Sequence, residues 1–144
     1  MRPDSDFVKW FEKIVKVKCS EVNVRCLGVQ TPESLIQSLL NADMYVHPSY
    51  IDNSPNSLCE AQYLGLPCCA TNVGGVSSLI KDKVSGIMIP SNAPFDMAMA
   101  IKNCYDNEDI WREYSFNAKA AAQKRHNPER IIQQLISVYS DLTE

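Results

Sequence analysis

Apolar residues along the chain follow two spacings, one typical of strands and one typical of helices. Short apolar or alternating runs predict strands at residues 22–27, 44–46, 68–71 and 86–90. Apolar residues three and four positions apart predict helices at 5–19, from Thr31 onward, at 76–81, from about Phe95, and over 108–141 with a break at Asn127–Pro128. Because strands alternate with helices, we expect an α/β fold: a parallel, Rossmann-like sheet with flanking helices and a helical tail.

The helix that follows residue 53 has clear start and stop signals. Ser54 is the expected N-cap, and Pro55 suits the first helical position, where a missing N–H costs nothing. Gly65 is the expected C-cap, and Pro67 prevents the helix from continuing. In the helix near Phe95, the predicted apolar side includes Ala98, Ile101 and Tyr105.

The start of the helix after residue 53 has the features of an anion site. The backbone N–H groups of Asn56 and Ser57 would be unpaired at the positive end of the helix dipole, which attracts phosphate. Glu60, further along the helix, could reach sugar hydroxyls beside that phosphate. A second loop, with Gly74 and Gly75, exposes backbone after the next strand. Such loops at strand ends are how a doubly wound sheet holds a nucleotide.

The stretch from Asp52 to Gly75 also resembles a known signature. It has a carboxylate, seven further residues, Glu60-Ala61, then Gly-x-Pro, a small-residue strand ending in Thr71, and Val-Gly-Gly. This order resembles the donor-binding motif of retaining glycosyltransferases with the GT-B fold, the sucrose-synthase-like glycosyltransferase family 4. The segments Ala-Asp-strand-Pro-Ser at 42–49 and Gly-Ile-Met-Ile-Pro at 86–90 extend the resemblance, which covers roughly residues 24–101.

The resemblance implies roles for particular residues. Glu60 matches the carboxylate that holds the donor's ribose hydroxyls, and Asp52 matches the one that faces the donor sugar, where family members usually have glutamate. The remaining expected donor-binding residues are Asn53, Pro55, Asn56, Ser57, Leu58, Gly74 and Gly75.

Each of these roles has a plainer alternative. Glu60 could be an ordinary exposed helix glutamate, and Gly74–Gly75 a helix-entry turn. For Asp52, the role at the donor sugar and that of a turn former beside Asn53 are given equal weight. His47 is interpreted as structural, because nothing nearby in the sequence completes a catalytic set.

Compared with the family, the chain lacks two strand–helix units and the N-terminal acceptor domain. We therefore interpret residues 1–144 as a single, incomplete nucleotide-sugar-binding domain, with residues 108–144 as its C-terminal helices. The isolated chain is expected to be inactive. It should associate with itself or another polypeptide, or close the gap by moving the strand at Val24 next to residues 44–46.

Composition narrows the class of protein. The chain has 144 residues, 45% of them hydrophobic and 22% charged, as in ordinary globular domains. A net charge of −3 argues against nucleic acid as a partner. The six cysteines form no C-x-x-C pair, which favours reduced thiols, a cytoplasmic location and no metal.

Together these observations predict the donor-binding portion of a glycosyltransferase. The complete enzyme would transfer a hexose from a nucleotide diphosphate sugar to a saccharide or lipid-linked acceptor, in polysaccharide biosynthesis, with no metal or other cofactor. Self-association and peripheral membrane contact of the complete enzyme stay open. The alternatives are a non-catalytic nucleotide-sugar-binding or scaffold fragment, and a nucleotide-sugar epimerase of the same fold.

Overall fold

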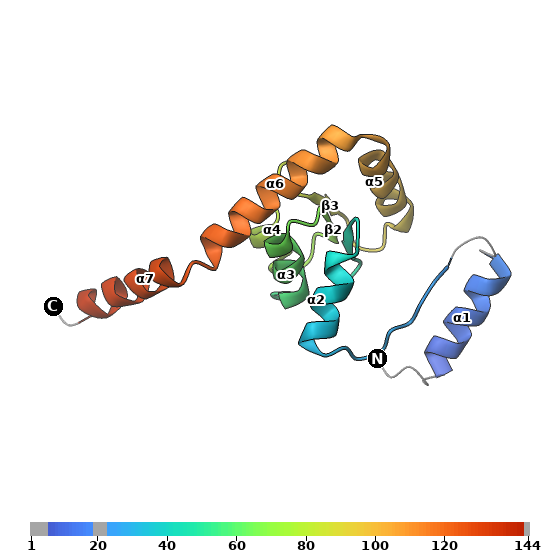
Figure 1. The fold of residues 1–144 in the computed structure, drawn as a ribbon, viewed down its shortest axis with the longest axis horizontal. Helices are drawn as coiled ribbons and strands as arrows, with labels where there is room; N and C mark the ends of the chain where they lie inside the picture. The colour runs from blue at the N-terminus through green and yellow to red at the C-terminus, as the bar shows by residue number, and fades with distance from the viewer. Residues whose placement is uncertain (1–5, 19–22, 143–144) are drawn as a thin grey trace. The chain divides into compact units, whose positions relative to one another are not determined.

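The computed structural model describes residues 6–18 and 23–142 (Figure 1). The chain separates into two compact units, one up to Ser38 and one from Leu39 onward. Within the described residues, helix α1 spans Asp6–Lys18 and α2 spans Pro32–Leu40. The predicted first helix is confirmed, although its expected ends at residues 5 and 19 lie outside the described residues. The single domain over residues 1–144 stays a prediction.

The second unit contains a parallel sheet, as the sequence predicts. Its strands are β1 (Tyr45–His47), β2 (Cys68–Thr71) and β3 (Ile87–Ile89), in the order β1-β2-β3. The register pairs Tyr45 with Cys68 and His47 with Ala70. Side chains alternate between the two faces of a strand, so Tyr45 and His47 share one face and Val46 lies on the other.

The strand predicted at residues 22–27 is wrong. Residues 23–28 carry no strand, and residue 22 lies outside the described residues. A strand needs a neighbouring strand that accepts its backbone hydrogen bonds, and in the described residues the sheet consists of β1, β2 and β3. The expected closure of the gap by Val24 next to β1 stays a prediction.

Helices pack on both faces of the sheet, α3 (Asn56–Leu64) on one and α5 (Pro94–Asp106) on the other. The remaining helices of this unit are α4 (Val76–Leu79), α6 (Glu108–Arg125) and α7 (Pro128–Asp141). On one face, Cys69 and Ile89 pack with Met97 of α5 in a buried apolar cluster. On the opposite face, α3 contacts β1 and β2, and it buries Leu58, Ala61 and Gln62.

Two local expectations change. Pro55, not Ser54, is the N-cap of α3, because the Ser54 amide donates to Asp52 Oδ1 at 3.1 Å, which draws this residue into the preceding turn. On α5 the buried residues are Met97 and Cys104, whereas Ala98 and Tyr105 are exposed. The predicted C-cap is confirmed: Gly65 has a φ of 87°, a left-handed conformation that favours glycine.

Helix α6 crosses the edge of the sheet where the strands begin. Trp111 Nε1 donates to the carbonyl of Asp43 at 2.9 Å, just before β1. The Ser115 hydroxyl donates to the carbonyl of Gly65, before β2, and the Asn117 amide donates to Val84, before β3, at 2.9 Å. One helix thus ties together the three loops that enter the strands. At the opposite edge, the strands end in the loops that lead to α3 and α4.

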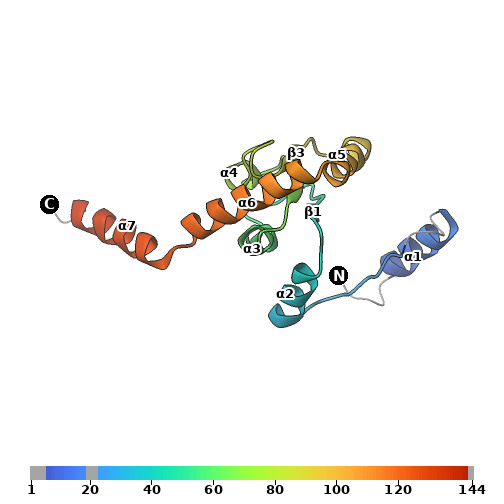
Figure 2. The same ribbon diagram turned by 45° about the horizontal axis from the view of Figure 1, so that its top comes forward.

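Helix α7 extends beyond the end of α6 (Figures 1 and 2). Asn127 caps it by accepting a hydrogen bond from the Arg130 amide at 2.9 Å, so the predicted break between α6 and α7 is confirmed. The helix buries no residue. Over residues 6–18 and 23–142, no helix is long and apolar enough to cross a bilayer.

Candidate functional site

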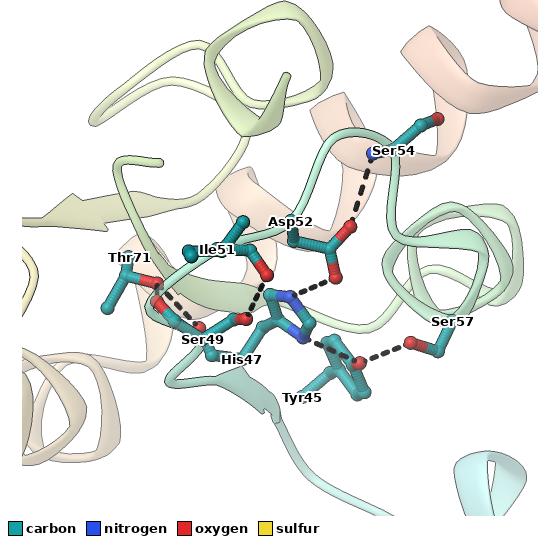
Figure 3. Close-up of polar contacts among 8 residues, drawn as sticks. All are labelled: Tyr45, His47, Ser49, Ile51, Asp52, Ser54, Ser57 and Thr71. Atoms are coloured by element: carbon teal, nitrogen blue, oxygen red, sulfur yellow. Dashed lines mark hydrogen bonds and ion pairs between the residues drawn. The ribbon is translucent and has the colours of Figure 1, made fainter. Parts of the chain in front are cut away.

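Two loops meet where β1 and β2 end. One loop leads from β1 to α3 and carries Asp52, and the other leads from β2 to α4 and carries Gly74 and Gly75. Figure 3 shows four residues of the first loop together with residues of β1, β2 and α3: Ser49, Ile51, Asp52 and Ser54 of the loop, Tyr45 and His47 of β1, Thr71 of β2 and Ser57 of α3. Because the carboxyl ends of neighbouring parallel strands lie at one edge, the sheet itself brings these loops together.

Both carboxylate oxygens of Asp52 have partners. Oδ2 lies 3.1 Å from His47 Nε2, and Oδ1 accepts the Ser54 amide at 3.1 Å. The second contact is the turn-forming role that the sequence left as an alternative. The first contact is new, because sequence reasoning assigned His47 no partner. The half-buried aspartate side chain, 28% exposed, is held in one orientation by both.

The contacts of His47 continue through Tyr45 to α3. The Tyr45 hydroxyl lies 3.3 Å from His47 Nδ1 and 2.6 Å from Ser57 Oγ. The two rings are nearly parallel, with centroids 6.1 Å apart. Burial raises the pKa of Tyr45, although the Ser57 hydrogen bond lowers it in part, so the phenol stays protonated. Four side chains from β1, the loop and α3 therefore form one connected series.

The glycine loop packs directly on the backbone of the Asp52 loop. A Cβ atom on Gly74 would lie 2.0 Å from the Asp52 carbonyl oxygen, and one on Gly75 would lie 1.9 Å from that of Asn53. The Gly75 amide also donates to the Asp52 carbonyl at 3.3 Å. Glycine is needed at both positions because any side chain would push the two loops apart.

Thr71, at the end of β2, contacts the backbone at the start of the loop that carries Asp52. Its hydroxyl oxygen lies 2.5 Å from the Ser49 carbonyl and 3.3 Å from the His47 carbonyl. The Ser49 hydroxyl in turn donates to the Ile51 carbonyl at 2.9 Å. The backbone of residues 47–51 is thus tied to the central strand.

The start of α3 leaves two amides available. The amides of Leu58 and Cys59 both donate to the Pro55 carbonyl, at 3.1 and 3.3 Å. Those of Asn56 and Ser57 precede these first helical bonds, as expected for a helix N-terminus. Leu58, an expected donor-binding residue, has its amide engaged and its side chain fully buried. The Leu58 amide is therefore not available to a ligand, whereas no such helical bond engages those of Asn56 and Ser57.

Glu60 lies on the exposed side of α3. It lines a shallow recess with Asn56, Cys59, Tyr63 and His126. Asn56 therefore joins this recess to the helix start, but Gly74 and Gly75 do not line it. That Glu60 and the glycine loop face one cleft stays a prediction.

Sequence reasoning interpreted His47 as structural and gave Tyr45 no role, so it missed the contacts that both side chains make. A signal for them exists: residues two apart on a strand share a face, so a tyrosine and a histidine at 45 and 47 both face α3. Their partner Asp52 is five residues further on, in a loop whose path no periodicity describes. Among residues 6–18 and 23–142, no group of three or more potential metal-ligating side chains comes together.

The chain matches known proteins along most of its length. Residues 4–140 match the family model described as glycosyl transferases group 1. A D-inositol 3-phosphate glycosyltransferase from Paenarthrobacter aurescens is 36% identical over 89 residues, which are 59% of this chain and 22% of that relative. A putative teichuronic acid biosynthesis glycosyltransferase, TuaC of Bacillus subtilis, is 38% identical over 84 residues, 58% of this chain and 21% of TuaC. The chain thus spans about a fifth of these relatives.

Solved structures have the same fold. HepE of Anabaena, in complex with UDP-glucose, has a TM-score of 0.83 at 24% identity, over 96% of this chain and 38% of HepE. Sucrose-phosphate synthase of Thermosynechococcus elongatus has a TM-score of 0.81 at 25% identity, over 99% of this chain and 36% of the synthase.

Proposed function

We propose, since this chain belongs to the glycosyl transferases group 1 family, that it is the donor-binding portion of a retaining GT-B enzyme of glycosyltransferase family 4. The complete enzyme transfers a hexose from a nucleotide diphosphate sugar to a saccharide or lipid-linked acceptor. The isolated chain, which spans about a fifth of its relatives, binds the donor and does not transfer the sugar.

One observation carries this proposal. The Asp52 carboxylate, on a loop held by the backbones of Gly74 and Gly75, and the two available amides at the start of α3 lie at the same edge of the sheet. Amides at a helix start bind anions, and a carboxylate accepts hydrogen bonds from hydroxyls. A diphosphate joined to a sugar presents an anion and hydroxyl groups side by side.

The amides of α3, Asp52 and Glu60 each have a role in this proposal. The amides of Asn56 and Ser57 meet the diphosphate and stabilise the charge that develops on it as the bond to the sugar breaks. Asp52 accepts hydrogen bonds from hydroxyls of the donor sugar, and Glu60 accepts hydrogen bonds from the ribose hydroxyls. The reaction needs no metal, and basic groups supplied by the rest of the enzyme complete the hold on the diphosphate.

UDP is the natural first probe. The related fold of HepE is known in complex with UDP-glucose and with UDP. A cytoplasmic location belongs to the same proposal, because thiols stay reduced in the cytoplasm. It is supported by the free thiols of Cys26, Cys59, Cys68, Cys69 and Cys104. The proposal also includes self-association and peripheral membrane contact of the complete enzyme.

Calorimetric titration with UDP tests the proposal. We expect weak binding, and we expect Glu60→Ala to weaken it by about 1–3 kcal/mol, the usual cost of losing a charged hydrogen-bond partner. The matched control is Glu113→Ala, which removes an exposed glutamate of α6 and should leave the affinity unchanged.

Two outcomes would count against it. Equal affinities of the Glu60 and Glu113 variants would remove the ribose role of Glu60. Absence of any UDP binding to the unaltered chain would contradict the donor site and favour the scaffold alternative.

A further inference from the structure

A series of hydrogen bonds joins the start of α3 to Asp52 through two side chains of β1. It runs from Ser57 Oγ to the Tyr45 hydroxyl (2.6 Å), from that hydroxyl to His47 Nδ1 (3.3 Å), and from His47 Nε2 to Asp52 Oδ2 (3.1 Å) (Figure 3). The donor site proposed above uses both ends of the series. It assigns no role to Tyr45 and His47, the two residues in the middle.

The chemistry of the groups fixes the direction of this series when the imidazole is neutral. An ionised carboxylate only accepts, so His47 Nε2 carries the hydrogen and donates to Asp52. Nδ1 of the same neutral ring then has a lone pair, and the Tyr45 hydroxyl must donate to it. The Tyr45 oxygen is left to accept from Ser57. Every donor in the series points toward the Asp52 carboxylate.

We propose that Tyr45 and His47 are positioning residues that set the orientation of the Asp52 carboxylate toward the donor sugar. This inference rests on the proposed donor site. His47 acts on Asp52 directly, and Tyr45 acts on the imidazole by keeping Nδ1 as an acceptor and Nε2 as the donor.

The surroundings of Asp52 explain why such support matters. The residue before it, Ile51, is 87% exposed, and Asp52 itself lies in the loop between β1 and α3. The Ser54 amide holds Oδ1 within the turn, so the rotation of the carboxylate depends on what holds Oδ2. His47 is the neighbour that does so from a strand, whose backbone is fixed by pairing with β2.

The role can be separated from general stabilisation by comparing two ligands. UDP reaches only the amides and the ribose site, whereas UDP-glucose also presents a sugar to Asp52. A residue that positions Asp52 should change the affinity for UDP-glucose and spare that for UDP. A residue that merely supports the fold should weaken both equally.

The test is calorimetry with UDP and UDP-glucose on the full chain and three variants. We expect His47→Leu to lower the UDP-glucose affinity by about tenfold, typical of a lost hydrogen bond to a charged group, and to leave UDP binding within about twofold. His47→Gln retains an amide that can donate to Asp52 and should recover most of the loss. Tyr45→Phe should give an intermediate loss, confined to UDP-glucose.

A second measurement requires no ligand. The ¹⁵N resonances of the His47 ring, identified by their disappearance in His47→Leu, should show the Nε2–H tautomer at a pH where the ring is neutral. An Nδ1–H tautomer would overturn the proposal whatever the ligands do, and so would equal losses of UDP and UDP-glucose affinity in His47→Leu.

Failure of the donor site has a different signature. If the unaltered chain binds neither UDP nor UDP-glucose, the proposed function falls, and the sugar-positioning role falls with it even if the tautomer is Nε2–H. If the chain binds both ligands and His47→Leu loses neither, the donor site stands and the positioning role alone is overturned.

Discussion

Gly74 lies so close to Asp52 that a Cβ atom on the glycine would be 2.0 Å from the aspartate carbonyl oxygen. The two residues are on different loops, one after β1 and one after β2. Their contact means that the glycine loop limits the positions that the backbone of the Asp52 loop can take. Glycine at this point is therefore a condition for the geometry of the carboxylate, in addition to its role in the turn.

Substitution of Gly75 isolates the effect of this close approach. Its φ of −86° suits any residue, so Gly75→Ala should destabilise only because its Cβ meets the Asn53 carbonyl. We expect the free energy of unfolding to fall by about 2–3 kcal/mol, in the range of overpacking. Denaturant unfolding measures it.

Gly65→Ala is the matched control. Gly65 has a φ of 87°, but the nearest atom to its Cβ would be Cδ of the flexible Lys119 side chain, at 3.3 Å, and the next, Ser115 Oγ at 3.6 Å, is at ordinary contact distance. The cost should therefore be about 1 kcal/mol of left-handed strain. A Gly75 variant as stable as the unaltered chain would show that the loops can separate freely.

Arg125, at the end of α6, should be a major contributor to stability. Its guanidinium donates to Gln62 Oε1 and to the Leu79 carbonyl, both at 3.1 Å, and Gln62 is fully buried. Arg125→Ala leaves the Gln62 oxygen without this partner, so we expect a loss of about 1–3 kcal/mol in unfolding free energy. The exposed neighbour Lys124 gives the control, Lys124→Ala.

A double-mutant cycle completes the test of this pair. Combining Arg125→Ala with Gln62→Leu should cost less than the sum of the two single changes, because the second change removes the unpaired oxygen. Strictly additive losses would mean that the two side chains do not interact.

Two buried thiols predict an alkaline loss of stability. Burial raises the pKa of Cys68 to about 12 and that of Cys69 to about 11, from an ordinary value of 9.0. Above pH 9 the unfolded chain loses these protons and the folded chain keeps them, so the free energy of unfolding falls as pH rises. The slope is at most about 1.4 kcal/mol per pH unit for each thiol.

Unfolding measured from pH 8 to pH 11 checks this expectation. Cys68→Ala should make the decline shallower than in the unaltered chain. A slope that is the same in both proteins would assign the alkaline loss to other groups.

The open edge of β1 predicts association. In the described part of the chain, β1 pairs with β2 alone, so the backbone groups on its other side have no strand partner. Such an edge can pair with another chain. We expect light scattering at micromolar concentration to give a mass above 16.2 kDa, rising with concentration. A monomer at all concentrations with β1 amides that exchange as slowly as those of β2 would contradict this.

The sequence by itself determined the features that depend on neighbouring residues. The C-cap at Gly65, the break before Pro128 and the three strands of the sheet are all visible in it, because capping, proline geometry and short apolar runs act within a few positions. The family resemblance added the expected roles of Asp52 and Glu60.

Only the tertiary structure decided what lies beside what. The segment at 22–27 has the pattern of a strand, but pairing requires a neighbour, which no local pattern supplies. The Asp52–His47 contact depends on where a loop returns over the sheet, and the burial of Gln62 depends on α6 passing above it. Periodicity states which face a residue is on, whereas the partner across that face follows from the packing of elements distant in sequence.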